Sequence, residues 1–128
     1  IDEIVSYGGV KNRQEILEIQ KNSQILLLIW RSGKGEEGTL TGKIFEYLAA
    51  GRPIISTGEK PGEVERLLQK TKAGIHCRTV SETQNFLCQV YQEWIKNHCV
   101  KYQGIEQEIM KYSHIEMAKR FSKALKND

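Results

Sequence analysis

The 128-residue sequence predicts an α/β fold in which a parallel sheet is followed by helices alone. Strand-like and helix-like patterns alternate through residues 1–80, and only helical patterns follow in residues 81–128. Residues 24–30 (QILLLIW) are apolar on both sides, which is typical of a strand buried inside a parallel sheet. Residues 39–57 read as a helix that passes directly into a short β-branched strand, as in the second half of a βαβ unit.

The first predicted strand covers residues 4–7 (IVSY), and a glycine pair ends it. A helix follows, with Asn12 as its N-cap and Glu15 three residues later in the spacing of a capping box. This helix ends near Asn22, and the apolar run 24–30 then forms the second strand.

The next helix ends where Gly51 can adopt the left-handed conformation of a C-terminal cap, and Pro53 follows it. Residues 53–57 (PIIST) form the third strand. The apolar face of the helix is made of Ile44, Phe45, Leu48 and Ala49.

A further helix places Val64, Leu67 and Leu68 on one face, and residues 73–77 (AGIHC) form a weaker fourth strand. The longest helix is predicted to start at Ser81 or Thr83 and to pack an apolar stripe against a core. That stripe consists of Phe86, Leu87, Val90, Tyr91, Trp94, Ile95 and His98. A short helix around Ile105 and Ile109 comes next, and the spacing of Ser113 and Glu116 predicts a capping box that opens a last, basic helix.

The composition narrows the class of ligand. The net charge is only +3, and no run of five basic residues occurs, so a phosphate-bearing small molecule is favoured over nucleic acid. Cys77, Cys88 and Cys99 are spaced 11 apart, which matches no zinc pattern, and they are expected to be reduced in a cytosolic protein. His76, His98 and His114 are isolated and are interpreted as structural or surface residues, so no metal site is expected.

We expect residues 1–128 to form a single, incomplete domain. Four parallel strands make a small sheet, and Ile1 is not an initiator methionine, so earlier strands are expected to lie outside these residues. No apolar run approaches the roughly 20 residues that a membrane-spanning helix needs.

The candidate site lies at the carboxyl ends of the predicted strands, where ligands bind in open parallel sheets. The loop 31–38 (RSGKGEEG) follows the most buried strand and leads to the helix that begins near Thr41. The backbone N–H groups of Thr41, Gly42 and Lys43 at this helix start would form an anion site.

Residues 41–55 (TGKIFEYLAAGRPII), preceded by residues 25–38 (ILLLIWRSGKGEEG), resemble the C-terminal nucleotide-sugar-binding domain of GT-B glycosyltransferases of family 4. The resemblance implies a Rossmann-like domain of which this chain is the later half. It also implies transfer of a sugar from a UDP- or GDP-sugar with retained configuration and without a metal cofactor. The acceptor-binding N-terminal domain would be a partner outside this sequence, and the 128 residues alone would be inactive.

The same resemblance assigns roles to individual residues. Glu46 would hydrogen-bond the ribose hydroxyls, and Lys43 and Arg31 would contact phosphate. The family spaces two acids as E-x7-E, which places the first acid at position 38, where this sequence has Gly38. Glu37, one residue earlier, is therefore the candidate catalytic acid, with Glu36 beside it.

Simpler interpretations remain open for these residues. Glu46 could be a solvent-facing helix residue, Lys43 a surface lysine and Arg31 a group at a strand end. Glu36 and Glu37 could be solvated loop charges, in which case the chain would do without the first acid of the motif. As alternatives to the transferase, the chain could be a non-catalytic α/β binding or dimerisation module, or part of a sugar-nucleotide epimerase. For the transferase we expect an acceptor that is a glycan or a lipid-linked sugar, a role in surface polysaccharide synthesis, and a cytoplasmic location with peripheral membrane contact as an option.

Overall fold

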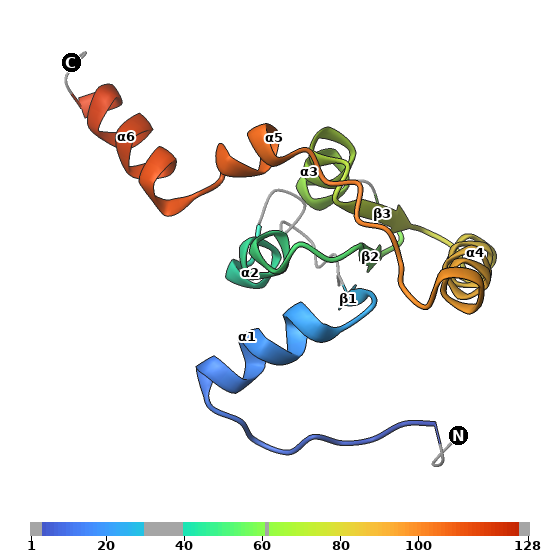
Figure 1. The fold of residues 1–128 in the computed structure, drawn as a ribbon. Coiled ribbons are helices and arrows are strands. Elements are labelled where there is room, and N and C mark those ends of the chain that lie inside the picture. The colour runs from blue at the N-terminus through green and yellow to red at the C-terminus, as the bar shows by residue number, and fades with distance from the viewer. Residues whose placement is uncertain (1–3, 30–39, 61, 126–128) are drawn as a thin grey trace.

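The structure is a computed structural model, and it describes residues 4–29, 40–60 and 62–125. Within these ranges, helices alternate with the strands of a parallel sheet and continue beyond the last strand (Figure 1). The α/β class is therefore confirmed, with three strands in the described residues. The chain order is α1 (Arg13–Asn22), β1 (Leu26–Ile29), α2 (Gly42–Ala50), β2 (Ile54–Thr57), α3 (Glu63–Thr71), β3 (Gly74–Cys77), α4 (Val80–Asn97), α5 (Glu106–Met110) and α6 (His114–Leu125).

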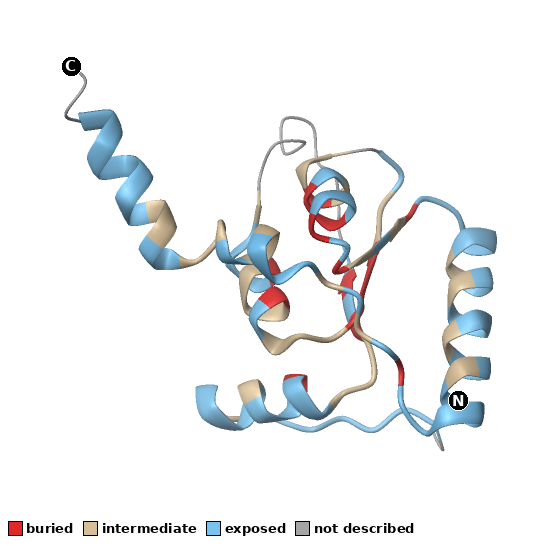
Figure 2. Ribbon diagram, turned by 45° about the horizontal axis from the view of Figure 1, so that its top comes forward, coloured by how far each residue is buried: buried red, intermediate tan, exposed pale blue. Residues whose placement is uncertain are grey.

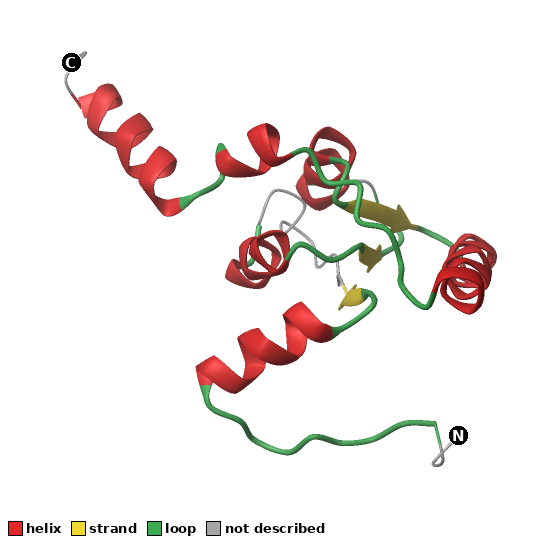
Figure 3. Cartoon of the chain, viewed as in Figure 1, coloured by secondary structure: helices red, strands yellow, loops and turns green. Residues whose placement is uncertain are grey.

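The sheet has the order β1-β2-β3, and both strand pairs are parallel. Leu26 lies opposite Ile54, which in turn lies opposite Gly74. The connecting helices α2 and α3 lie on one side of the sheet, and α4 lies on the other (Figure 3). This is the arrangement that right-handed crossovers between successive parallel strands produce.

The hydrophobic core lies between the sheet and the helices α2 and α3, where the buried residues cluster (Figure 2). Leu28 and Ile54 project from the sheet into this layer, because side chains alternate between the two faces of a strand. The residues that they meet are Ile44, Leu48, Val64, Leu67, Leu68 and Ala73. The predicted apolar faces of α2 and α3 are thereby confirmed, except that Ala49 is exposed.

Local signals set the ends of α1 and α2 as predicted. The Asn12 side chain accepts a hydrogen bond from the Glu15 amide at 3.0 Å, and Glu15 Oε2 accepts one from the Asn12 amide at 2.9 Å. This capping box satisfies two N–H groups that a helix start would otherwise leave unpaired. Gly51 ends α2 with φ 64° and ψ 40°, a conformation that a side chain would disfavour.

Residues 4–7, predicted as a strand, do not form one. The segment is exposed, with Ile4 at 88% and Tyr7 at 92% of full exposure, and it runs below α1 at some distance from the sheet (Figure 1). A strand is stable only when a neighbour satisfies its backbone groups and covers its side chains. The β-forming residues therefore stay extended without a partner among the described residues.

The start of α4 at Val80 was predicted one to three residues too late. Thr79 is the N-cap, and its side chain accepts from the Glu82 amide at 3.1 Å in a second complete capping box. The α4 stripe packs against the sheet only in part: Phe86 and Val90 are half-buried, but no residue of α4 is fully buried and Tyr91 remains 57% exposed. The apolar stripe of α4 can be buried only where another element covers it, and no such element lies beyond β1 in the described residues.

Helix α6 begins where the sequence predicts, directly after Ser113, and the short helix α5 begins at Glu106, with Ile105 as its N-cap. The Ser113 hydroxyl accepts a hydrogen bond from the Glu116 amide at 3.3 Å at the start of α6. Before it, α5 is fastened to α3 by the Ile105 amide, which donates to the Thr71 carbonyl at 2.7 Å. Helix α6 then extends away from the sheet, and none of its residues is buried (Figure 2).

Candidate functional site

The amino end of α2 lies at the carboxyl-end side of the sheet, because β1 leads into it. β1 ends at Ile29 and α2 begins at Gly42. The predicted site residues Arg31 and Glu37, together with Glu36, lie outside the described residues, and their roles stay predictions. Thr41, Gly42, Lys43 and Glu46 are described and can be placed.

The first turn of α2 has no side-chain cap among the described residues. Thr41 is the N-cap with extended backbone angles, but its side chain makes no capping hydrogen bond in the described part of the chain. The first intrahelical bond runs from the Ile44 amide to the Thr41 carbonyl at 3.2 Å. A Cβ built on Gly42 would meet no heavy atom within 4 Å. At a helix start the first amides, here those of Gly42 and Lys43, have no acceptor within the helix and can bind another group.

The other helix starts differ from this one. The starts of α1 and α4 are closed by complete capping boxes. α3 also lacks a side-chain cap, but its first turn carries Glu63 and Glu65, which repel an anion. The first turn of α2 contains no acid and carries the Lys43 ammonium. Among these four starts, α2 has the most favourable electrostatics for a phosphate.

Glu46 lies one turn further along α2 and reaches towards α1. Its Oε1 is 3.1 Å from Nη2 of Arg13, with the side chains 34% and 77% exposed, respectively. An ion pair this exposed contributes about 0–1 kcal/mol, because water screens it. Glu46 thus has a partner that the sequence did not reveal, since Arg13 is remote in the chain and forms no motif with it.

Tyr47 lies next to Glu46 and contacts the edge of the sheet. Its hydroxyl donates to the Leu27 carbonyl at 3.3 Å. Burial of the ring raises the pKa of Tyr47, and the neighbouring negative charge of Glu46 adds to the effect. The phenol therefore stays protonated and can keep donating this hydrogen bond.

His76 has a structural role, as expected. Its Nδ1 is 3.1 Å from the Ser56 hydroxyl and its Nε2 is 3.1 Å from the Gly58 carbonyl. Since the carbonyl can only accept, Nε2 carries the proton, and the Ser56 hydroxyl can donate to Nδ1. Ser56 is completely buried, and its contact with the half-buried His76 links β2 to β3.

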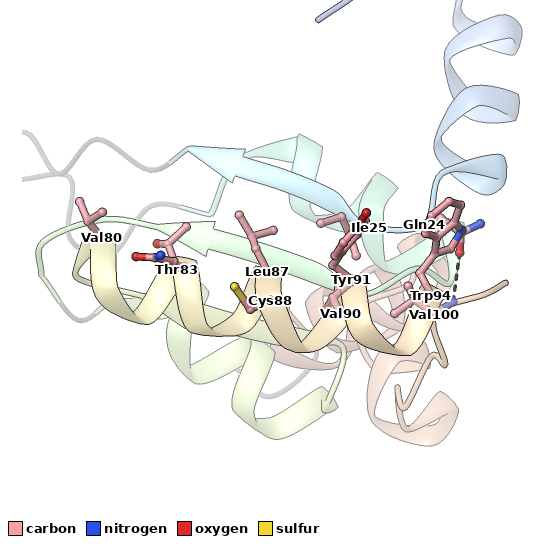
Figure 4. A pocket seen from close by; sticks show the side chains of 11 residues that line it. Gln24, Ile25, Val80, Thr83, Leu87, Cys88, Val90, Tyr91, Trp94 and Val100 are labelled. Atoms are coloured by element: carbon pink, nitrogen blue, oxygen red, sulfur yellow. Dashed lines mark hydrogen bonds between the residues drawn. The ribbon is translucent and has the colours of Figure 1, made fainter. Parts of the chain in front are cut away.

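An apolar groove does not coincide with the α2 site. This open groove of about 830 Å³ lies between α4 and the residues that lead into β1, and its walls are almost entirely apolar (Figure 4). A smaller cavity of about 300 Å³ lies at the carboxyl ends of β2 and β3, lined in part by Thr57, Gly58 and Arg78. Arg78 holds both carboxylate oxygens of Glu65, at 2.7 and 2.8 Å, so its charge is already paired.

Within residues 4–29, 40–60 and 62–125, no three His, Cys, Asp or Glu side chains come together in a way that could hold a metal ion. The helices in these ranges are also all too short or too polar to cross a bilayer. Comparison with protein-family models, with curated proteins and with solved structures gives no match for this sequence.

Proposed function

We propose that this chain supplies half of the donor site of a glycosyltransferase that uses a nucleotide-diphospho-sugar. The amides of Gly42 and Lys43 would hold the diphosphate, and the sugar would pass to a glycan or a lipid-linked acceptor. In the family that the sequence resembles, such transfer retains the anomeric configuration and needs no metal.

One observation carries this proposal: at the carboxyl end of a parallel sheet, the start of α2 has no acid in its first turn and no side-chain cap in the part of the chain that the structure describes. Unpaired N–H groups and the helix dipole together favour an anion there by about 0.3–1 kcal/mol for each interaction. The exposed Lys43 ammonium adds a positive charge within the same turn. Such donors can stabilise the charge that develops on a departing diphosphate.

Glu46 is the proposed ribose ligand. Its carboxylate is part exposed, and only Oε1 is engaged with Arg13. Two hydroxyls of a ribose could bond to the carboxylate, and hydrogen bonds to a charged group contribute about 1.5–3 kcal/mol each. A nucleotide could therefore displace the exposed Arg13 contact at little cost.

The test is calorimetric titration of UDP, GDP and ADP into the polypeptide that the gene encodes, with Glu46→Ala and Arg13→Ala variants. If Glu46 binds ribose, Glu46→Ala weakens binding by roughly 10–100-fold, because about 1.4 kcal/mol corresponds to a factor of ten. Arg13→Ala is the matched control, since it removes the ion pair and leaves the carboxylate. Absence of nucleotide binding contradicts the proposed function, and equal affinity of both variants and the unaltered protein contradicts the ribose role.

A second candidate function, assembly through an exposed surface, is favoured by the apolar groove beside α4. Leu87 and Trp94 there are each 41% exposed, although helices of this kind normally bury such residues. A stable dimer without nucleotide affinity, measured by light scattering and the same titrations, supports that function. A monomer that binds UDP or GDP excludes it.

A further inference from the structure

The apolar side of helix α6 is uncovered. Ile115 and Phe121 are each 68% exposed, and Leu125 is 64% exposed, on a helix that extends away from the sheet (Figure 2). Single apolar side chains are common on protein surfaces, but a group of them on one helix usually marks a contact with another apolar surface. The question is which surface fits this helix.

The charged and the apolar residues of α6 lie on different sides of the helix. Its four Glu, Lys and Arg residues follow the spacing i, i+3, i+4 and i+7, so they form one stripe of about 100° at 3.6 residues per turn. These residues are Glu116, Lys119, Arg120 and Lys123. Phe121 and Leu125 lie opposite the stripe, and Ile115 and Met117 also lie outside it. The helix is therefore amphipathic over its whole length.

The positions of the basic residues favour an anionic surface as the partner. Lys119 lies at one border of the charged stripe and Arg120 at the other, so each is next to the apolar side. Long basic side chains in such positions lay their apolar stems along the surface and reach outward with the charged group. Three positive charges against the one negative charge of Glu116 give the stripe a net charge of +2.

The one acid of α6 does not oppose an anionic partner. Glu116 lies within the stripe, away from Phe121, and its Oε1 is 2.6 Å from Nζ of Lys119. The two side chains are 40% and 67% exposed, respectively, so water screens their attraction. Lys119 can therefore exchange this carboxylate for the phosphate of a lipid.

The length of α6 fits a helix that lies in the plane of a bilayer surface. Its 12 residues span about 18 Å at 1.5 Å per residue, which is less than the roughly 30 Å of the hydrocarbon core. A helix with one apolar and one basic side lies parallel to the membrane. Its apolar side chains then enter the boundary of the acyl chains, and its basic groups stay at the level of the headgroups.

The apolar groove beside α4, in a second copy of the chain, is a poorer partner for α6. No Asp or Glu lines this groove among the residues that the structure describes. Lys119 and Arg120 would flank the apolar contact there without a counter-charge, and removing their charges from water would oppose the binding. The phosphates of a lipid surface supply that counter-charge on both borders of the helix.

The start of α6 is attached to the helix that carries the candidate donor site. The ring of Tyr112, two residues before α6, stacks on Phe45 of α2 with ring centroids 6.3 Å apart. Tyr112 also packs against the hydrophobic core. A surface bound by α6 is therefore held next to the body of the protein through α2.

We propose that α6 binds the surface of an anionic phospholipid membrane. Phe121 and Leu125 enter the acyl region. Lys119, Arg120 and Lys123 bind the phosphates of the headgroups. The binding needs no nucleotide, so it is independent of sugar transfer; if both take place, α6 brings the donor site to a lipid-linked acceptor.

The test is co-sedimentation of the polypeptide that the gene encodes with phospholipid vesicles, without nucleotide. We expect binding to an equal mixture of phosphatidylcholine and phosphatidylglycerol, weakened by high salt, and little binding to phosphatidylcholine alone. Phe121→Ser should weaken the binding roughly tenfold or more, because the ring no longer leaves water on binding. Tyr91→Ser is the matched control, since Tyr91 is a similarly exposed aromatic residue in the groove beside α4, and it should bind as the unaltered protein does.

A second pair of variants separates the position of a charge from the net charge. Lys123→Gln should weaken binding to the anionic vesicles roughly fivefold, as expected for one basic residue at a charged membrane surface. Lys96→Gln removes the same charge from an exposed position on α4 and should have a much smaller effect. Circular dichroism checks that all variants stay folded.

Three results would overturn the proposal. The first is the absence of binding to the anionic vesicles, and the second is equal binding of Phe121→Ser and the unaltered protein. The third is a dimer that Phe121→Ser converts to a monomer in light scattering, because the apolar side of α6 would then be an interface between two copies. Nucleotide titration without vesicles stays a separate measurement, so failure of membrane binding leaves the donor site untouched.

Discussion

Arg13 of α1 and Glu46 of α2 form the contact that joins the first helix to the candidate donor site, with Nη2 and Oε1 3.1 Å apart. Arg13 is 77% exposed, so water competes for its guanidinium throughout. The contact orients Glu46 beside the start of α2, yet its exposure makes it easy to exchange for a ligand.

The first prediction concerns the strength of this ion pair. In a double-mutant cycle with Arg13→Ala and Glu46→Ala, we expect a coupling of about 0–1 kcal/mol in the free energy of unfolding. Urea denaturation followed by circular dichroism measures it. A coupling of several kcal/mol would mean that the pair is structural, and Glu46 would then be unavailable to a nucleotide.

The second prediction uses two glycines with opposite surroundings. A Cβ on Gly74 would lie 1.9 Å from the Ile54 carbonyl oxygen, so Gly74→Ala should separate β3 from β2 and destabilise the protein by about 2 kcal/mol or more. Gly42→Ala meets no atom within 4 Å and should leave thermal stability nearly unchanged. Gly42→Ala also distinguishes an effect on binding from an effect on stability, because it should weaken nucleotide binding by crowding the diphosphate while the protein stays folded. Unaltered stability of Gly74→Ala would show that the strands lie further apart than described.

The third prediction concerns acid unfolding at the contact between α5 and α3. The hydrogen bond from Lys111 Nζ to Glu108 Oε1 lowers the pKa of Glu108, with additional attraction from the charges of Lys111 and Lys70. A carboxyl with a lowered pKa contributes stability above its unfolded pKa of about 4.3, and this stability is lost as the pH falls through the folded value. Glu108→Gln should therefore lose less stability than the unaltered protein between about pH 5 and pH 3. Parallel denaturation curves at several pH values check this, and identical acid profiles would contradict it.

The fourth prediction concerns the end of α3. Lys72 adopts φ 55° and ψ 20°, the left-handed region that costs a side chain about 1–2 kcal/mol. Lys72→Gly removes this cost, but glycine also has more conformational freedom in the unfolded state. The free energy of unfolding should therefore rise by only about 0.5–1 kcal/mol. Lys70→Gly, inside the same helix, should lower the free energy of unfolding by about 1 kcal/mol, because glycine is a poor helix former. Loss of the weak contact between Lys70 and Glu108 would lower it further. Opposite signs from the same change two residues apart would confirm the left-handed cap, and equal signs would contradict it.

The parts of the fold that local chemistry determines could be predicted from the sequence. The Asn12–Glu15 capping box and the left-handed Gly51 depend on neighbours within one turn, and both are as expected. β1 could be predicted as a strand because its unbroken apolar sequence is visible without knowing which strand lies beside it. In contrast, the strand at residues 4–7 and the burial of the α4 stripe require a distant surface, and no pattern within the segment reports whether that surface is present.

The candidate site also contains some features that the sequence predicts and others that it does not. The start of α2 near Thr41 could be expected from the sequence, although the Thr41 side chain makes no capping hydrogen bond in the described part of the chain. The partnership of Glu46 with Arg13, and that of Tyr47 with the Leu27 carbonyl, arise from packing between segments remote in sequence. Periodicity and spacing carry no information about such contacts.

The binding of a nucleotide diphosphate at the start of α2 is the central claim, and the Gly42 and Lys43 amides report on it directly. In a titration of UDP or GDP followed by nuclear magnetic resonance, we expect saturable shifts of these two amide signals, reversed by phosphate competition and weakened in Lys43→Ala. The amides of Glu63 and Val64 at the start of α3 serve as the control and should stay unshifted. Shifts of equal size at both helix starts, or none at Gly42 and Lys43, would contradict the claim.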